Sequence, residues 1–573
     1  MNQRVLRFFW VAGLVLGLAV FACANTKKLT ILHTNDTHSA MVPFETGFIP
    51  AVGPAPRQTP GIGAGLWNVW HFPFNQDYAG IARMATLIKT LRVKDKNVLA
   101  LNAGDVFVGS FEFNKYLGYP ELKIMENLYD AMELGNHEFD LGVGTLAGVL
   151  NGQIAGAAPV TLPLLCANVD FSATPLGGMV QSSIVRTVGG VKVGIFGLLT
   201  QEPQNYSENV NKLFPYPYDG SGTTLWEYAT GLVTDLRKQG CKVVICVSHL
   251  GTMLDVGALS KVPGIDVIIG GHSHDAYPQP IVANGKIIVQ AGQFGWYLGE
   301  LKLNVGSNGV TLDSWVLHRV DGRIKEDPQV RGIVNKVKAG VVSDPRFGPV
   351  YSQHVALALR DILKSWPANS QNRDTALGNL VTDAFISRLK KAGLPFPVDC
   401  ALDVLGYLGA DIPAGKVVGN NIMRAVPYGY NEASGLGFKV VVVPLPPEGL
   451  LGGLEYAADN VTLTTDLAVQ GSGITYSYDS SKTPGNRVDP TSVMVNGELV
   501  AAQIGVKDKY YYVAMSEQVF NFLNALTGGQ LSSLPTGLFE YNIVRDYMKS
   551  LRFVQYKSEG RIKDTNPAPA AVK

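Results

Sequence analysis

The segment Ala131–Gly142, which reads AMELGNHEFDLG, gathers polar side chains directly after a short buried-looking lead-in. Asn136, His137, Glu138 and Asp140 lie close together between two glycines. A turn needs one Asn or Asp to bend the chain, so a turn alone does not account for this density. The segment indicates the end of a buried strand that leads into a functional loop.

Four other apolar runs in the first half end in a similar way. LTILH, NVLALNAG, KVVICVS and IDVIIGG are short and rich in Val, Ile and Leu, which is typical of buried strands. The polar residues that follow them are Asp36 and His38, Asp105, His249, and His272 with His274. Amphipathic segments between the runs predict helices, so the region 27–325 is expected to be an α/β domain. Binding sites in such domains form beyond the carboxyl ends of the strands, where these residues lie.

The side chains at these strand ends form a ligand set for divalent cations. Asp, His and Asn suit Mn²⁺, Zn²⁺, Mg²⁺ or Fe rather than a thiolate-preferring ion. A carboxylate such as Asp105 can bridge two cations, and two metal ions can clamp a phosphoryl group and activate water. Taken singly, Asp36 could cap a turn and Asp105 could cap a helix. Their shared position after strands favours a metal site, whereas His33 lies within a strand and is expected to be structural.

Length and composition indicate a folded protein with more than one domain. The chain has 573 residues, and single cores stop growing near about 250–300 residues. Hydrophobic residues make up 46%, which suits packed cores, and the net charge of +1 gives no basic field for nucleic acid. We expect a helical linker over 326–345, a second domain over 346–560 and a tail over 561–573. A segment rich in Pro, Gly and aromatic residues, 41–77, interrupts the first domain.

The first residues have the features of a targeting segment. Arg4 and Arg7 precede an apolar stretch of signal-peptide length, and Ala22 begins a small-x-small cleavage site, so 1–24 is expected to be a signal peptide. Alternatively, Cys23 lies in an imperfect lipobox, and its lipidation would anchor the mature chain. An uncleaved anchor is a third reading, although the stretch is short for a membrane span. We expect an exported monomer, either periplasmic or lipid-anchored at the cell envelope.

The remaining cysteines are Cys166, Cys241, Cys246 and Cys400. Cys241 and Cys246 flank a strand-like run that would hold them about 16 Å apart if extended, too far for a disulfide. We therefore expect buried free thiols.

Five motifs, in this order, resemble those of a known enzyme family. HTNDTH, NAGDVFVGS, ELGNHEFDLG, VSHLG and GGHSHD are similar to motifs of the calcineurin-like metallophosphoesterases. LGNLVTDAF and ADIPAGKV resemble the C-terminal domain of the exported 5′-nucleotidase branch, which includes UDP-sugar hydrolases and 2′,3′-cyclic phosphodiesterases. The resemblance covers nearly the whole mature chain apart from 41–77. It implies a four-layer α/β/β/α catalytic domain, a helical linker and a smaller α/β substrate-binding domain.

The resemblance also implies roles for the residues at the strand ends. One metal ion would be held by Asp36, His38, Asp105 and His274. The other would be held by Asp105, Asn136, His249 and His272, with Asp105 bridging. His137 would stabilise developing charge or protonate the leaving group, and Asp140 would orient it, since a carboxylate partner fixes the imidazole tautomer and favours its charged form. Glu138 is expected to be structural.

The second half departs from the family at its substrate contacts. In VLGYLG at 404–409, Val404 and Gly409 stand where the family has Asn and Arg, and Gln371 lies near the place of a phosphate-binding Arg. Gln530 replaces a ribose-binding Asp. An Arg fork on phosphate or a stacked aromatic ring contributes on the order of 1 kcal/mol or more. These losses would weaken nucleotide selection without disturbing the metal site.

Three residues remain as expected substrate contacts: Arg373, Tyr428 in VPYGY, and Phe522 in NFLNALTGGQ, the last two resembling the aromatic pair that stacks on the base. The insertion offers further aromatic residues, namely Phe44, Phe48, Trp67, Trp70, Phe72 and Phe74. These either replace lost base contacts or pack against the protein's own surface.

We expect an exported two-metal phosphohydrolase that acts as a 5′-nucleotidase on nucleoside monophosphates. A first alternative keeps the metal site but acts on another ester: a cyclic nucleotide, a sugar diphosphate, or a sulfur ester as in the related thiosulfohydrolases. A second alternative is an exported binding or surface protein on a retired enzyme scaffold. The complete ligand set argues against the second.

Overall fold

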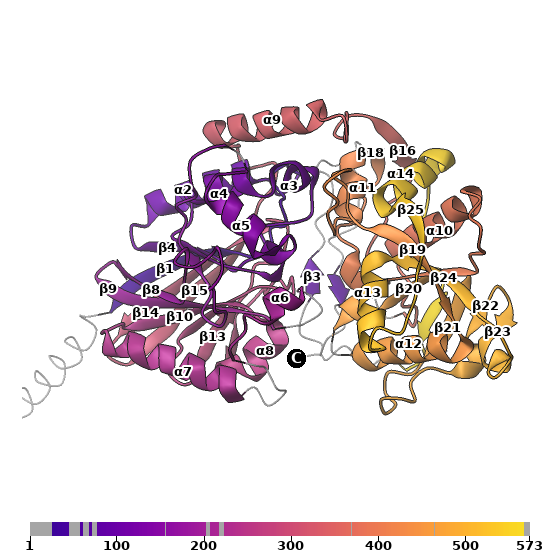
Figure 1. Cartoon of the computed structure of the whole chain (residues 1–573). Coiled ribbons are helices and arrows are strands. Elements are labelled where there is room, and N and C mark those ends of the chain that lie inside the picture. Colours follow the sequence, from indigo (N-terminus) through magenta and orange to yellow (C-terminus); the bar gives the residue numbers. More distant parts are fainter. Residues whose placement is uncertain are drawn as a thin grey trace, which may run out of the picture.

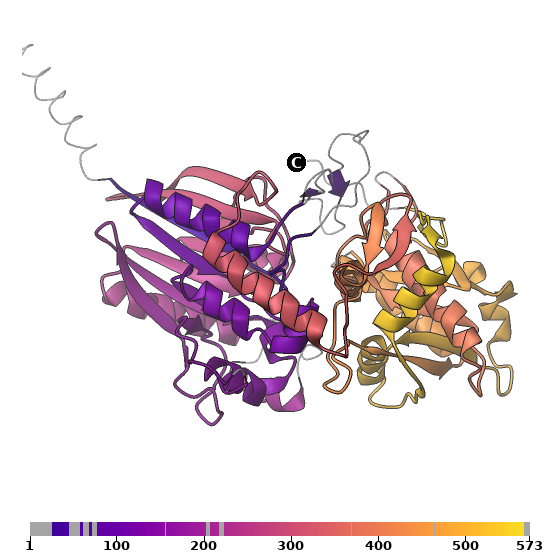
Figure 2. The same cartoon turned by 90° about the horizontal axis from the view of Figure 1, so that it is seen from above.

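The structure is a computed structural model with two domains side by side, bridged by one long helix (Figures 1 and 2). It describes residues 26–44, 58–60, 68–70, 77–154, 156–201, 207–216, 223–367, 370–462 and 464–566. The predicted signal peptide and Cys23 lie outside these ranges, as do most of the 41–77 insertion and the end of the chain. Within the described ranges, we find no helix with both the length and the apolar character needed to cross a membrane.

The first domain is built on two β-sheets with the strand orders β15-β14-β1-β4-β5-β6-β7 and β12-β13-β11-β10-β9-β8. The first sheet consists of β1 (Lys27–Thr34), β4 (Val98–Asn102), β5 (Ala131–Glu133), β6 (Leu164–Leu165), β7 (Val180–Gln181), β14 (Tyr297–Gly306) and β15 (Gly309–Arg319). The second consists of β8 (Ser183–Val188), β9 (Val191–Leu199), β10 (Val243–His249), β11 (Val267–Gly270), β12 (Ile281–Ala283) and β13 (Lys286–Val289). The strands before the predicted ligand loops pair in parallel within each sheet.

Helices cover the outer face of each sheet. These are α2 (Ile81–Lys94), α3 (Phe111–Tyr116), α4 (Tyr119–Met125), α5 (Gly142–Leu150), α6 (Glu208–Asn211), α7 (Thr223–Lys238) and α8 (Thr252–Gly257). Successive strand residues point to opposite faces, so Ile31 of β1 packs between the sheets with Ile245 of β10. Leu32, the next residue, packs instead against the helices on the outer face. The α/β/β/α order of layers is therefore confirmed.

The linker is a single helix, α9 (Pro328–Ser343). It begins where the Asp327 side chain accepts hydrogen bonds from two backbone N–H groups, with Pro328 at the first helical position. Val334 and Val337 pack into the core of the first domain, whereas Val341 belongs to the core of the second. The helix is therefore packed against both domains rather than merely tethering them.

The second domain contains a five-stranded sheet, β20-β17-β24-β19-β25, and two smaller sheets, β18-β16-β26 and β23-β22-β21-β27. Its strands are β16 (His354–Ala358), β17 (Cys400–Val404), β18 (Gly415–Val418), β19 (Lys439–Leu445), β20 (Val469–Ser472), β21 (Ile474–Tyr478), β22 (Met494–Val495), β23 (Glu498–Leu499), β24 (Tyr511–Ser516), β25 (Leu534–Phe539), β26 (Phe553–Val554) and β27 (Ile562–Asp564). Its helices are α10 (Ala376–Lys391), α11 (Gly419–Ala425), α12 (Pro447–Asn460), α13 (Glu517–Leu526) and α14 (Glu540–Leu551).

The end of the chain, the cysteines and His33 bear on three of the expectations from the sequence. The tail predicted for 561–573 starts too early, because β27 pairs in parallel with β21 and so belongs to the second domain. Cys166, Cys241, Cys246 and Cys400 are free and buried, which confirms the expected thiols. His33 is buried within β1 and stacks on Trp315, away from the ligand loops.

Part of the insertion is described. Phe44, at its start, is buried and stacks on Tyr78, and the guanidinium of Arg424 in the second domain lies 3.8 Å from the centre of its ring. Phe44 therefore packs within the protein. In the middle of the insertion the backbone forms two short paired strands, β2 (Gln58–Pro60) and β3 (Asn68–Trp70). The side chains of Phe48, Trp67, Trp70, Phe72 and Phe74 lie outside the described residues.

The second domain buries a pair of carboxyl groups, Asp403 on β17 and Glu540 at the start of α14. Burial raises the pKa of Asp403 to about 7. Burial and the charge of Asp403 raise the pKa of Glu540 well above its usual range. Because both values exceed those of the unfolded chain, the folded domain binds more protons, and this contribution to stability is lost as the pH rises through 7.

We expect the melting temperature of the metal-free protein to fall between pH 5 and pH 8, and Asp403→Asn to make this fall smaller. Each pKa unit corresponds to about 1.4 kcal/mol, so the variant should gain more than about 1 kcal/mol relative to wild type at the higher pH. Thermal unfolding in a chelator across this pH range measures the effect. Asp508→Asn, which changes an exposed aspartate of the same domain, is the control. If the melting temperature of Asp403→Asn fell with pH as steeply as that of wild type, the raised pKa of Asp403 would not be the cause of the fall.

Candidate active site

The loops that follow five strands meet at one end of the two sheets. They follow β1, β4 and β5 in the first sheet and β10 and β11 in the second. The structure brings together the His and Asp members of the predicted ligand set in two groups, each with donor atoms within 4.8 Å of one another: Asp36, His38, Asp105 and His274, and Asp105, His249 and His272. The remaining predicted ligand, Asn136, lies against the second group.

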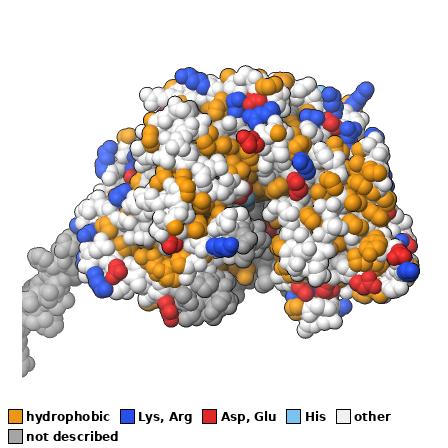
Figure 3. All heavy atoms as spheres, in the orientation of Figure 1, with side chains coloured by type: hydrophobic (Ala, Val, Ile, Leu, Met, Phe, Trp, Pro, Cys, Tyr) orange, Lys and Arg blue, Asp and Glu red, His pale blue; other side chains and the backbone are white. Residues whose placement is uncertain are grey.

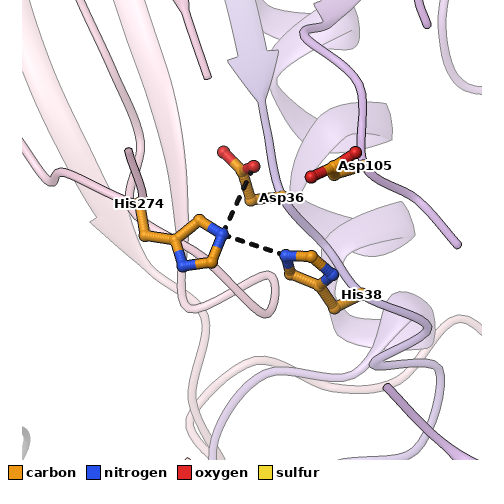
Figure 4. Close-up of side chains that lie close together, drawn as sticks. All are labelled: Asp36, His38, Asp105 and His274. Carbon is orange, nitrogen blue, oxygen red and sulfur yellow. Dashed lines mark hydrogen bonds and ion pairs between the residues drawn. The ribbon is translucent and has the colours of Figure 1, made fainter. Parts of the chain in front are cut away.

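In the first group, side chains from both sheets converge (Figure 4). The Nε2 atoms of His38 and His274 are 3.0 Å apart, and Asp36 Oδ1 lies 3.5 Å from the same atom of His274. Asp36 and His38 come from the loop after β1, whereas His274 comes from the loop after β11. Imidazole nitrogens and carboxylate oxygens that converge in this way form a donor set suited to divalent transition metals.

In the second group, His249 Nε2 lies 3.1 Å from Asp105 Oδ2 and 3.3 Å from Asn136 Oδ1. His272 Nδ1 lies 3.0 Å from the same amide oxygen. The other ring nitrogen of His249 is 2.6 Å from the carbonyl oxygen of Ala103. Donation to that carbonyl fixes the orientation of the ring, so that Nε2 can bind a metal ion once its proton is displaced. Asp105 is a member of both groups, so one carboxylate connects them.

Five of the predicted ligands adopt left-handed backbone conformations, which are uncommon for residues other than glycine. Their φ angles are 48° for Asp36, 44° for His38, 53° for Asp105, 71° for His272 and 59° for His274. Each such residue costs about 1–2 kcal/mol, and the strain persists only where the surroundings enforce it, most often at functional sites.

Glu138 helps to hold two of these loops in their strained conformations. Its carboxylate accepts hydrogen bonds from the backbone N–H groups of Gly135, Asp105, Val106 and Phe107. It therefore ties the loop after β4 to the loop after β5. Glu138 is buried and belongs to neither ligand group, so the structural role expected from the sequence agrees with its contacts.

The electrostatics of the site suit a bound cation. Burial, together with the charge of Asp105, raises the pKa of Asp36 to about 7 despite the nearby His249. Burial lowers the pKa of His249, but the charges of Asp105 and Asp36 outweigh it and raise the value to about 9. In the described part of the chain, the ion pairs of these two carboxylates are all with histidines. Two buried carboxylates without a lysine or arginine partner are a fitting environment for divalent metal ions.

His137 belongs to neither ligand group, although its ring lies edge-on beside that of His38, with centroids 5.3 Å apart. Its Nδ1 lies 2.9 Å from Asp140 Oδ2, and its ring stacks on Tyr428 of the second domain with centroids 5.3 Å apart. Burial lowers the pKa of His137, but Asp140 and Asp105 outweigh this effect and raise it to about 10. These two carboxylates favour the charged, proton-donating form of the imidazole.

A cavity of about 2290 Å³ lies between the domains and includes the ligand loops on one wall. The surface is hollowed in the same region in the space-filling view (Figure 3). Tyr428 and Phe522, two of the three expected substrate contacts, line the cavity. Arg373 does not: it is buried, donates to the carbonyls of Ser370 and Asn372, and lies over the ring of Trp366. The Arg373 guanidinium thus serves the packing of its own loop.

At the positions that depart from the family pattern, the structure shows no basic side chain that reaches the cavity. A Cβ atom at Gly409 would lie 2.2 Å from the carbonyl oxygen of Arg424 and 2.7 Å from Pro427, so this loop has no room for an arginine. Gln371 donates to the carbonyl oxygen of Thr565 and does not line the cavity. Val404 lines the cavity but adds no polar group.

One cavity residue, Lys364, was missed by the sequence analysis. It lies in DILKSW, which matches no motif, and only the folded chain brings it to the cavity. The available clue was indirect: the second half lacks the expected phosphate-binding arginines, so another basic residue had to be considered.

Models of two protein families match the chain. The model for calcineurin-like phosphoesterases matches residues 29–276, which include all of the ligand loops. The model for the 5′-nucleotidase C-terminal domain matches residues 360–521 in the second domain.

Individual proteins are similar over most of the chain. Human 5′-nucleotidase is 27% identical over 96% of this chain and 93% of its own length. A trifunctional nucleotide phosphoesterase of Bacillus subtilis is 28% identical over 87% of this chain, which spans only 35% of that longer protein. The crystal structure of a 5′-nucleotidase precursor from Thermus thermophilus superposes with a TM-score of 0.74 at 27% identity, covering 94% of this chain and all of the other.

Proposed function

This chain belongs to the calcineurin-like phosphoesterases that carry a 5′-nucleotidase C-terminal domain, and from that premise we propose that it releases phosphate from nucleoside 5′-monophosphates. The chain is a metal-dependent phosphoester hydrolase by family. The observation that supports nucleotides as substrates is the cavity between the domains, which is lined by members of both ligand groups and by the aromatic rings of Tyr428 and Phe522. Similarity to 5′-nucleotidases along nearly the full length adds to it.

We assign the seven predicted ligands to two divalent metal ions. Asp36, His38, Asp105 and His274 would hold one ion, and Asp105, Asn136, His249 and His272 would hold the other. When bound, the ions supply Lewis acidity toward the phosphoryl oxygens and activate water as the nucleophile. The chain's own contribution is to hold these donors in place through the Glu138 hydrogen bonds and the His249 contact with Ala103.

His137 is proposed as the acid of the reaction. It lies beside the second ligand group through its backbone N–H, which donates to Asp105 Oδ1 at 2.9 Å. Asp140 orients the ring and maintains its charge, so that the imidazolium can stabilise negative charge on the phosphoryl group or give a proton to the leaving oxygen. Tyr428 closes over the ring from the second domain and limits its contact with water.

The N-terminal features support export as part of the proposal. Arg4, Arg7 and the apolar stretch that follows them fit a signal peptide, and Cys23 keeps lipid anchoring open as the alternative. We also propose a monomer as the working unit.

A phosphate-release screen tests the function. Purified protein loaded with Mn²⁺ or Zn²⁺ is expected to release phosphate from nucleoside 5′-monophosphates, and chelation is expected to abolish the release. The same screen includes UDP-sugars, cyclic nucleotides and bis(p-nitrophenyl) phosphate. Hydrolysis of the diesters alone would replace the proposal with a phosphodiesterase. If the protein hydrolysed none of these esters and retained no metal, a binding protein on an inactive scaffold would be favoured.

A further inference from the structure

Among the residues that the structure describes, the basic side chains on the walls of the cavity between the domains are one lysine and several histidines. Of these residues, Lys364 is the only lysine or arginine on the cavity walls. It lies between β16 and α10, in the second domain, and its backbone N–H donates to Asp411 Oδ1 at 2.6 Å. That hydrogen bond anchors the segment to the loop that contains Gly409. The position of Lys364 is therefore set by the packing of the second domain.

Lys364 lines the cavity from the second domain, and four members of the proposed ligand set line it from the first: Asp105, Asn136, His272 and His274. Burial lowers the pKa of Lys364, opposed by Asp466 and Asp411. The ion pairs and side-chain hydrogen bonds found within the described ranges do not include the Lys364 ammonium. A half-buried ammonium whose charge is only partly balanced by Asp466 and Asp411 can contact an anionic group of a ligand.

Other basic residues of the second domain cannot take this place. The loop at Gly409 excludes an arginine, and Arg373 is buried against its own loop. Arg424 does not line the cavity, and its guanidinium donates instead to the carbonyls of Val42 and Pro43. Without Lys364, the described residues of the wall opposite the ligand groups would present only neutral and acidic side chains, including Asp403, Asp411 and Asp466.

We infer that Lys364 is a specificity-determining residue whose ammonium contacts the phosphoryl oxygens of the substrate from the second domain. The inference rests on the proposed phosphoester hydrolysis and adds the contact that selects the anion. An ammonium is a compact point charge and cannot form the planar two-point contact of an arginine. Selection by Lys364 therefore depends on the charge of the ester more than on its geometry. A dianionic monoester gains more from this contact than a monoanionic diester does.

The test compares Lys364→Met with Lys364→Arg, which keeps the charge. Hydrogen bonds to charged groups are strong enough that Lys364→Met should raise KM for a nucleoside monophosphate about ten- to a hundredfold. KM for bis(p-nitrophenyl) phosphate should rise less, and Lys364→Arg should stay within a few-fold of wild type. Lys557→Met, at an exposed lysine of the same domain outside the cavity, is the matched control. Metal content and melting temperature should be unchanged in all three.

A binding measurement separates this inference from the proposed function. Titration of the metal-loaded protein with inorganic phosphate should show a Kd that is weaker in Lys364→Met by a similar factor. If wild type hydrolyses no monoester, the proposed function fails, while phosphate binding still decides the role of Lys364. Unchanged KM and unchanged phosphate Kd in Lys364→Met would overturn the inference. A fall in kcat alone, with both of these constants unchanged, would overturn it as well.

Discussion

Replacing Asp105 with alanine is expected to remove both metal ions and to reduce phosphate release to the background of the assay. Among the described side chains, Asp105 is the only one that belongs to both ligand groups. Its Oδ2 lies 3.1 Å from His249 Nε2, and its Oδ1 accepts the backbone N–H of His137. Loss of the ions forfeits several kcal/mol of transition-state stabilisation, which corresponds to a rate loss of about 10³-fold or more.

Metal analysis of the purified variant, together with phosphate release, measures this result. Asp235→Ala changes an exposed aspartate on α7 and should leave both metal content and rate unchanged. Asp105→Asn keeps the size of the side chain and removes only its charge, so it separates the role of the charge from that of packing. An Asp105→Ala protein that retains two ions per chain and full activity would contradict the bridging assignment.

His137→Ala is expected to lower kcat by about 10²- to 10⁴-fold while leaving two metal ions bound. The imidazole belongs to neither ligand group and is oriented by Asp140. Its removal should therefore affect charge stabilisation and proton donation without affecting metal affinity. Asp140→Asn should produce a smaller loss, because the ring remains but its charged form is less favoured.

Rates and metal content are measured on the same preparations. His318→Ala is the matched control, since His318 lies on β15 beside Glu300 and outside the cavity. Metal loss in His137→Ala would mean that the residue is a ligand and that its catalytic assignment is wrong. If His137→Ala bound both metal ions and kept the wild-type rate, His137 would have no role in the reaction.

Local patterns were sufficient to predict the first domain and its ligand loops. Short runs rich in Val, Ile and Leu, each followed by Asp, His or Asn, indicated parallel strands whose ends converge, and the structure brings those side chains into two groups. This works because the carboxyl ends of parallel strands in one sheet lie on the same side, so position in the sequence implies position in space. The role of Glu138 as a structural residue also followed from its place in the motif, although its hydrogen bonds to four backbone N–H groups did not.

The substrate side of the cavity was less predictable. Arg373 was expected to contact substrate, yet its guanidinium donates to nearby carbonyls and lies over the ring of Trp366. The direction of a long side chain depends on neighbours from distant parts of the chain, which a local pattern does not specify. The tail boundary was misplaced for a related reason: β27 is short and is recognised as a strand only through its pairing with β21.

The sequence by itself determined the α/β class, the order of the ligand loops, the free thiols and the absence of arginine at position 409. Only the tertiary structure decided what replaces that arginine. Gly409 packs so closely against the Arg424 carbonyl that no side chain fits. Lys364, which belongs to no motif, is the one lysine or arginine that the described part of the chain places on the cavity wall. The physical reason is that metal ligation is encoded by a few residues next to each strand end. The charge of an interdomain cavity depends instead on how separate loops pack together.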